Sequence, residues 1–298
     1  KPVTKSLSLS WVLGLSVAAA AAIDLVCVHY GSIAATFWHL DLGKANGSIV
    51  LPSRLDLQSI GAWLSWVRQQ PLSLAAFVPV AILLLTRSDV CLKAIAILFS
   101  IGCAIILSAH WARWLQFLYQ TPFNRSDPVF QQDISFFTFD LPIAQLVEFW
   151  LMGTILVTFC SVLLLYLLSG NALSEGRFRG FSVRQQRHLQ VLGGGVMLVM
   201  AMRYGLRRYE LLYSSEGATY GANFIDIKAR LPAESILGLL AGSIGIMLLL
   251  RGFFAAYPPK PKSSYLYKVW HLYEFISPES AIATYFITAV LSSWIVPA

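Results

Sequence analysis

One carboxylate, Asp24, stands within an otherwise apolar stretch near the start of the sequence. An isolated charge is costly in apolar surroundings, so such a carboxylate is a candidate site for a proton or an ion. Asp24 also precedes the expected end of this stretch, Tyr30, by only about six residues, or roughly 9 Å of helix. From there its side chain could reach water or a loop arginine. We favour this structural role and keep the ion or proton site as the alternative.

Four histidines fall near the ends of apolar stretches: His29, His110, His188 and His271. An imidazole in such a place could bind a metal, or the magnesium of a chlorophyll in a photosynthetic source. Their spacing matches no known metal or haem motif, and histidines beside interfacial tryptophans are common. The sequence therefore predicts no certain cofactor, with chlorophyll or carotenoid as the alternative.

Asp127, Asp133 and Asp140 lie close together in one polar segment. Three carboxylates could gather around a calcium ion, which needs six to eight oxygen ligands. The spacing fits no calcium loop, so we predict no metal site. We expect these aspartates to cap helices and to pair with Arg203, Arg207 or Arg208.

A basic cluster interleaved with Phe178 and Phe181 superficially resembles a nucleic-acid patch; it consists of Arg177, Arg179, Arg184 and Arg187. Because the cluster lies between two apolar runs, we interpret it as a contact for anionic lipid headgroups, worth about 1 kcal/mol per basic residue. No nucleic-acid binding is predicted.

Motifs of catalysis do not occur in the sequence. It contains no Ser-His-Asp order, no paired carboxylates within an apolar run, no phosphate-binding glycine loop and no H-E-x-x-H. We therefore predict that the chain is not an enzyme.

The elements that must position these residues are long apolar helices. Hydrophobic residues make up 57% of the chain and charged residues 12%, against about 25% charged in soluble proteins. A run of about 20 apolar residues matches the thickness of a bilayer, where helices satisfy every backbone group. The sequence predicts an all-α bundle in a single membrane domain with seven spans, at 9–30, 71–86, 92–118, 141–168, 188–204, 231–254 and 281–298.

The distribution of charge gives an orientation. The arginine-rich segment at 177–187 favours the cytoplasmic side, which places the amino terminus inside and, after seven crossings, the carboxyl terminus outside. The expected location is a bacterial plasma membrane, or a thylakoid in a cyanobacterium. The last residues are apolar and have no polar anchor, so we expect the natural chain to continue into an extracytoplasmic domain.

Glycines mark two of the predicted spans. Gly193, Gly194 and Gly195 are adjacent in the fifth, while Gly238 and Gly242 form a GxxxG in the sixth. Such residues let helices approach closely, which is our first interpretation. A broken transporter helix at the three glycines is the alternative.

Two segments predicted outside the cytoplasm combine turn formers with aromatic residues. They read DPVFQQDISFFTFDLP (127–142) and YGLRRYELLYSSEGATYGANFIDIKARLP (204–232). We expect Pro142 in the first turn of the next helix, capped by Asp140 or a preceding residue.

These two segments resemble the signature loops of the UPF0182 family, uncharacterised membrane proteins found notably in actinobacteria and cyanobacteria. The resemblance covers roughly residues 111–298 and is expected to fail over 30–68. It implies seven amino-terminal helices followed by a large extracytoplasmic domain. It brings no catalytic residue.

Together these patterns predict a structural or assembly protein in the lipid bilayer. Residues of the two segments would form a loop platform that supports an outer domain or a protein partner: Asp127, Pro128, Phe130, Asp133 and Phe136 from the first, and Arg208, Tyr209, Glu210, Gly221 and Asp226 from the second. The alternatives are a transporter or channel for a lipid or hydrophobic solute, and an accessory subunit of a photosynthetic or respiratory complex.

Overall fold

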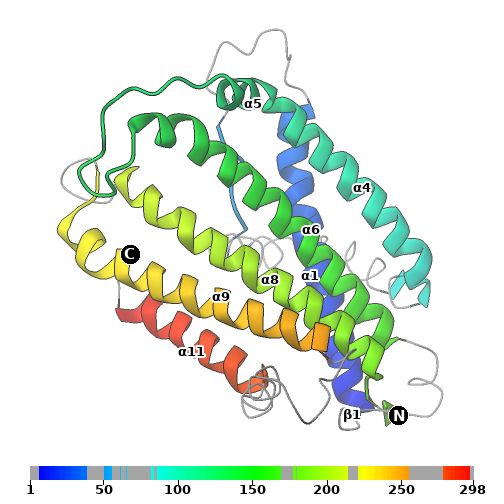
Figure 1. The fold of residues 1–298 in the computed structure, drawn as a ribbon. Coiled ribbons are helices and arrows are strands. Elements are labelled where there is room, and N and C mark those ends of the chain that lie inside the picture. The colour runs from blue at the N-terminus through cyan, green and yellow to red at the C-terminus, as the bar shows by residue number, and fades with distance from the viewer. Residues whose placement is uncertain are drawn as a thin grey trace. The chain divides into compact units, whose positions relative to one another are not determined.

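The computed structural model describes residues 7–38, 50–55, 61, 65, 82–83, 86–168, 177–178, 180–213, 221–254 and 278–295. Its architecture is helical (Figure 1), apart from a two-residue strand pair in which β1 (Leu7–Ser8) runs antiparallel to β2 (Arg177–Phe178). The α-helices are α1 (Leu9–Trp38), α4 (Ser88–Ala109), α5 (Trp111–Leu118), α6 (Leu141–Leu167), α8 (Val183–Glu210), α9 (Leu231–Phe254) and α11 (Pro278–Ile295). A short 3-10 turn, Leu211–Tyr213, follows α8.

Helices long and apolar enough to cross a bilayer number five in the described part of the chain. They are Ser10–Trp38, Ser88–Ala109, Phe136–Leu167, Val183–Tyr213 and Asp226–Phe253, and they make the chain an integral membrane protein. Most of the predicted span 71–86 lies outside the described residues. The predicted span 281–298 overlaps α11, which is helical but is not one of the five. Seven crossings remain a prediction.

Several helix boundaries differ from expectation. The predicted span 92–118 is divided at His110, which ends α4 and begins α5. The first helix continues past Tyr30 to Trp38, because its last turns remain largely apolar. The hydroxyls of Ser32 and Thr36 are satisfied by carbonyls of the preceding turn.

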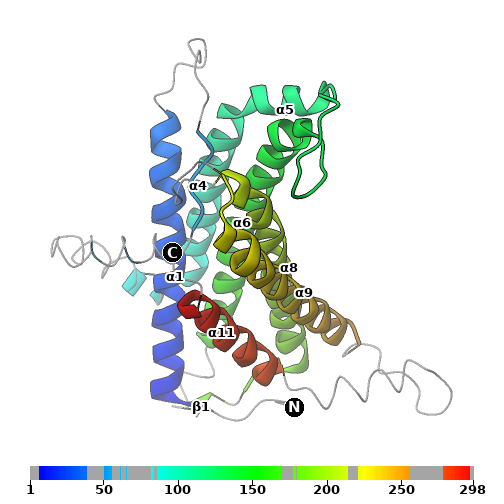
Figure 2. The ribbon, with the colours of Figure 1, turned by 90° about the vertical axis from the view of Figure 1, so that its left-hand side faces the viewer.

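By its internal contacts the chain forms two compact units: Lys1–Gln120 with Phe149–Gln185, and Thr121–Glu148 with Gln186–Ala298. In the first unit α1 and α4 lie side by side (Figures 1 and 2). Tyr30 of α1 stacks on Phe149 of α6 at 4.3 Å between ring centroids, and its hydroxyl donates to the Phe149 carbonyl at 2.6 Å. A Cβ at Gly153 would collide with the Tyr30 ring, so this contact requires glycine.

In the second unit α8 and α9 pack through glycines. A Cβ on Gly194 would lie 2.9 Å from the Gly245 carbonyl oxygen, and one on Gly238 would lie 3.3 Å from the Tyr204 Cβ. Gly194, the middle one of the three adjacent glycines, therefore serves close packing. The helix is continuous across them, so the interpretation as a broken transporter helix is wrong.

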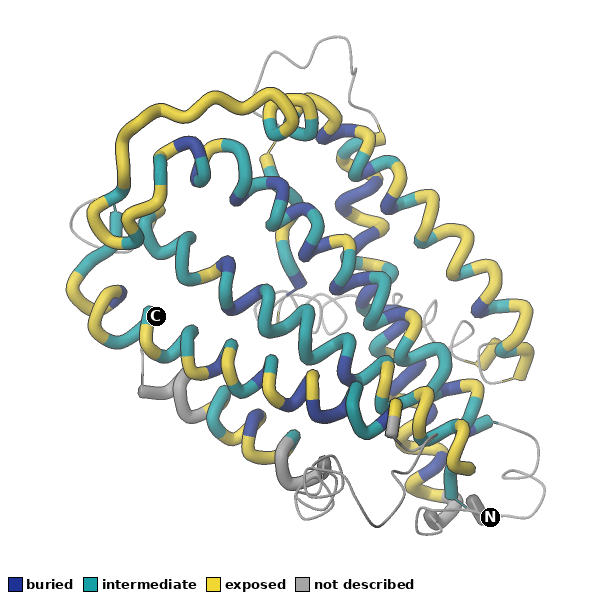
Figure 3. Tube along the Cα trace, viewed as in Figure 1, coloured by how far each residue is buried: buried dark blue, intermediate teal, exposed yellow. Residues whose placement is uncertain are grey.

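Exposed side chains on the helices are often apolar. Along α4, yellow over much of its length in Figure 3, Ile97, Leu98 and Ile101 are all at least half exposed. Such a face suits contact with lipid tails.

Two π-helical turns precede α6 and α9, at Phe136–Asp140 and Asp226–Arg230, and both lead into Leu-Pro. Leu141 donates its N–H to the Phe136 carbonyl, and Leu231 donates its N–H to the backbone carbonyl of Asp226. A proline inside an α-helix clashes with the carbonyl four residues earlier, and a wider π turn relieves this crowding. Pro142 is the second residue of α6 and lies in its first turn as expected, although helical backbone already precedes it at 134–140.

Candidate functional site: a buried charge network beneath aromatic loops

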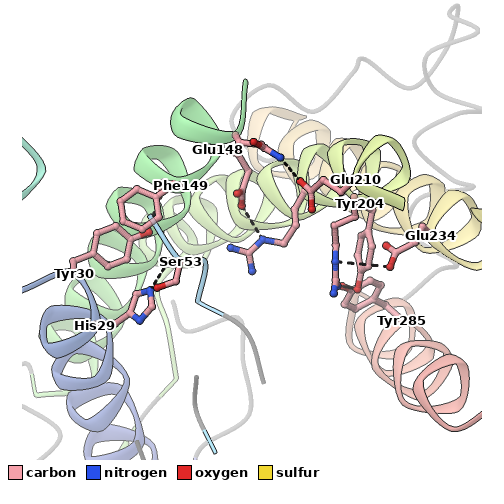
Figure 4. Close-up of polar contacts among 12 residues, drawn as sticks. His29, Tyr30, Ser53, Glu148, Phe149, Tyr204, Glu210, Glu234 and Tyr285 are labelled. Carbon is pink, nitrogen blue, oxygen red and sulfur yellow. Dashed lines mark hydrogen bonds and ion pairs between the residues drawn. The ribbon is translucent and has the colours of Figure 1, made fainter. Parts of the chain in front are cut away.

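A buried ion pair joins α6 and α8 in the second unit. The Arg203 Nε donates to the Glu148 Oε1 at 2.8 Å (Figure 4), and the Glu148 side chain is fully buried while that of Arg203 is 9% exposed. Both ions must lose water to reach this place, a cost that only close pairing offsets. Intramembrane charges of this kind mark functional or strongly structural positions.

More polar contacts surround this pair. Gln145 of α6 donates to Glu210 of α8 at 2.7 Å, and Arg207 lies 3.8 Å from Glu234 of α9. The Tyr204 and Tyr285 hydroxyls lie 3.0 Å apart and join α8 to α11. Four helices of the second unit thus share one charge network, which we define as Gln145, Glu148, Arg203, Tyr204, Arg207, Glu210, Glu234 and Tyr285.

Sequence reasoning missed the centre of this network. It expected Arg203, Arg207 or Arg208 to pair with Asp127, Asp133 or Asp140, whereas Arg203 pairs with Glu148. The available signal was that both residues fall inside predicted spans, at 141–168 and 188–204, with opposite charge.

Three of the predicted loop platform residues, Phe130, Phe136 and Tyr209, meet in an aromatic cluster. Tyr209 packs on Phe130 at 4.8 Å and on Phe136 at 4.9 Å between ring centroids, and Phe137 and Tyr213 extend the cluster. Arg208, Tyr209 and Glu210, expected in a loop, belong instead to the last turns of α8, because the helix continues beyond 204. Which partner the platform serves remains a prediction.

Two platform aspartates bind backbone amides. The Asp127 Oδ2 accepts from Val129 at 2.9 Å and from Phe130 at 2.6 Å. The Asp133 Oδ1 accepts from Ser135 at 2.8 Å and from Phe123 at 3.1 Å, so Asp133 rather than Asp140 lies at the start of the helix. Hydrogen bonds from Ser135 above all, with Phe123 and Asn124 after it, lower the pKa of Asp133.

The other platform half is shaped by Asp226 and Gly221. The Asp226 Oδ2 accepts from the Asn223 amide at 2.9 Å while the Asn223 Oδ1 accepts from the Asp226 amide at 2.8 Å, a reciprocal cap. Asp226 also pairs with Arg230 at 3.2 Å. Gly221 has φ of +115°, which favours glycine. Pro128 is exposed in the connection between Asp127 and Phe130.

The remaining predicted residues lie elsewhere. Asp24 is in the middle of α1, and its surroundings are considered below. Arg177 is in β2, Arg184 and Arg187 are exposed on α8, and Arg179 lies outside the described residues. The lipid-headgroup role of these arginines stays a prediction.

The histidines have backbone neighbours. The Nε2 of His29 lies 2.9 Å from the Ser53 carbonyl oxygen (Figure 4). His110 is buried, with Nδ1 2.7 Å from the Ile106 carbonyl and Nε2 3.4 Å from that of Val50. Both ring nitrogens of His110 thus face carbonyls rather than a ligand. His188 is exposed, and His271 lies outside the described residues.

The model of an uncharacterised protein family, UPF0182, matches residues 4–298. The chain belongs to the UPF0182 family. The match extends over residues 30–68, where we expected the likeness to fail. No solved structure matches the chain.

Similar UPF0182 proteins come from cyanobacteria. That of Nostoc sp. is 42% identical over 251 residues, covering 84% of this chain and 25% of the relative. That of Trichodesmium erythraeum is 36% identical over 310 residues, covering 98% of this chain and 30% of the relative. The UPF0182 chain thus spans between a quarter and a third of the length of these relatives.

Proposed function

We propose that this chain is the membrane-embedded assembly module of a larger protein, and that its loop platform holds an extracytoplasmic domain or a partner protein. The observation that carries the proposal is the packing of Tyr209 against Phe130 and Phe136, which joins the end of α8 to the 127–142 segment, far away in sequence. A surface built from two such regions can present a fixed shape to a partner.

The charge network supports this role by bracing the platform. Gln145 holds Glu210, the residue next to Tyr209, and Glu148 holds Arg203 further along α8. Buried hydrogen-bonded charges restrict how helices can slide or rotate. A rigid base of this kind suits assembly, and the proposal includes no catalytic activity.

Exposed groups at the platform offer places for a partner. Phe224 is 76% exposed and Ile225 is 52% exposed, beside the buried Asp226 cap. An exposed aromatic side chain of this kind is typical of protein contacts.

The curated relatives support an outer domain, since most of their length lies outside the matched region. We propose seven crossings with the amino terminus cytoplasmic and the platform outside. In this topology the remaining part of a longer protein would emerge on the platform side.

Site-specific photo-crosslinking tests the proposal. In the full-length protein in native membranes, Phe224 is replaced by a photoreactive phenylalanine analogue, and Leu239 of α9, similarly exposed at 73%, serves as the matched control. We expect position 224 to crosslink to the outer domain or to a protein, and position 239 to crosslink only to lipid. Lipid adducts alone at both positions would overturn the proposal.

A further inference from the structure

Asp24 lies at the centre of a membrane-crossing helix. The span runs Ser10–Trp38 over 29 residues, so 14 residues separate Asp24 from either end. At a rise of about 1.5 Å per residue this is about 21 Å. Even if the hydrocarbon layer, about 30 Å thick, is shifted fully toward one end of the span, Asp24 stays about 9 Å inside it. An aspartate side chain is too short to reach the interface, contrary to our sequence-based expectation.

The side chain is buried among apolar groups and thiols. Asp24 is 9% exposed, between Ile23 and Cys27 on α1. The cluster that packs against this part of α1 contributes Leu92 and Cys91 from α4, and Leu164 and Cys160 from α6. The titratable groups in that cluster are therefore the thiols of Cys27, Cys91 and Cys160, while Lys93 beside Leu92 is exposed.

Among the residues that the structure describes, no counter-charge accompanies this carboxylate. Within the described residues Asp24 makes neither a hydrogen bond nor an ion pair, unlike Glu148, which is bound by Arg203 at 2.8 Å. An unpaired charge at such depth costs several kcal/mol, and the group avoids that cost by taking up a proton. Among the described residues, no group of three or more histidine, cysteine, aspartate or glutamate side chains is placed to hold a metal ion.

We propose that Asp24 is a proton-binding site of the membrane bundle, which holds its proton as a neutral carboxylic acid at neutral pH. The ligand is a proton, and the site is independent of the loop platform, because every residue that forms it lies in the first unit. Glu148 differs from Asp24 in being fully buried and held by Arg203 at 2.8 Å.

A hydrophobic carbodiimide tests this assignment, because it reacts with protonated acids inside membranes. The acid O–H adds across one C=N bond, and the adduct rearranges to a stable N-acylurea without loss of atoms or change of oxidation state. The full-length protein in lipid vesicles is treated with dicyclohexylcarbodiimide between about pH 5 and about pH 9, and peptides are mapped by mass spectrometry.

We expect one carbodiimide on Asp24 at neutral pH, less labelling as the pH rises, and none on Glu148. No label on Asp24 at the acid end of the range, with the exposed Asp89 labelled in the same sample, would overturn the proposal. Infrared spectra provide a second measurement: the carbonyl stretch of a protonated acid should be present at neutral pH and absent from Asp24→Asn. An unchanged spectrum in the folded variant would also contradict the assignment.

Discussion

The pairing of Arg203 with Glu148 allows two charged side chains to be buried between helices. Each ion is buried, and each is stable there because the other lies within hydrogen-bonding distance. A buried pair differs in this respect from the half-exposed contact of Arg207 with Glu234, only one helical turn further along α8. Solvent screens the second contact, so the two arginines form a matched comparison.

Substitution of either buried partner should destabilise the bundle. We expect Arg203→Met or Glu148→Gln alone to lower the free energy of unfolding by about 3–5 kcal/mol, because a charge is left unpaired. The double variant should lose less than the sum, while Arg207→Met should cost at most about 1 kcal/mol. Denaturant titration in detergent measures all four. A loss for Arg203→Met no greater than for Arg207→Met would contradict the argument.

The hydrogen bonds of Asp133 predict that the loop around it loses stability in acid. Hydrogen bonds lower its pKa in the folded loop, so they stabilise the loop above the unfolded pKa of about 4. This stabilisation is lost as the pH falls through the folded pKa. Hydrogen exchange of the 121–135 segment, corrected for the intrinsic rate, should increase in acid for the native protein and change little for Asp133→Asn. The exposed Asp89→Asn serves as control and should behave as the native protein does.

At the scale of elements, the close approach of two helices depends on where glycines lie in them. Gly194 meets the Gly245 carbonyl, whereas Gly205 in the same helix has nothing within 4 Å of an added Cβ. Pro142 and Pro232 each follow a π turn, in which the wider helical backbone makes room for the proline ring. Both features act between or within helices without any charged group.

Substitution of Gly194 and of Gly205 in α8 by alanine should change the free energy of unfolding in opposite directions. Gly194→Ala forces α8 and α9 apart, and we expect a loss of about 1–3 kcal/mol in the free energy of unfolding. Gly205→Ala meets no neighbour and should gain about 0.5–1 kcal/mol from lower backbone entropy in the unfolded chain. Thermal unfolding of both variants measures the difference. Equal midpoints would argue against close packing at Gly194.

At the scale of the whole molecule, the predicted orientation in the membrane depends on which side each connecting segment occupies. One span, Phe136–Leu167, separates the segment that carries Ser126 from the segment that carries Ser182, so these two serines must face opposite sides. The basic cluster near Ser182 favours the cytoplasm for that segment.

Cysteine labelling can measure this orientation. The native cysteines lie within α1, α4 and α6 and can be replaced, after which Ser126→Cys and Ser182→Cys are introduced separately. A membrane-impermeant maleimide should label position 126 in intact cells, and position 182 only after permeabilisation. Labelling of both positions in intact cells would contradict the span, and the reverse pattern would invert the proposed orientation.

What the sequence determined by itself is the helical, membrane-embedded class and the family. Apolar runs predict helices because helix formation and membrane insertion depend on residues close together in the chain. The aromatic segments at 127–142 and 204–232 carried the resemblance to UPF0182, which the comparison confirms.

Tertiary structure alone decided which charges meet and how deep they lie. Glu148 and Arg203 are 55 residues apart in sequence, and no local pattern specifies such a pair. Asp24 lies midway along its membrane-crossing helix only because α1 remains helical to Trp38. Contacts between helices depend on the packing of whole surfaces, so the charge network and the isolated carboxylate appear only when the helices are assembled.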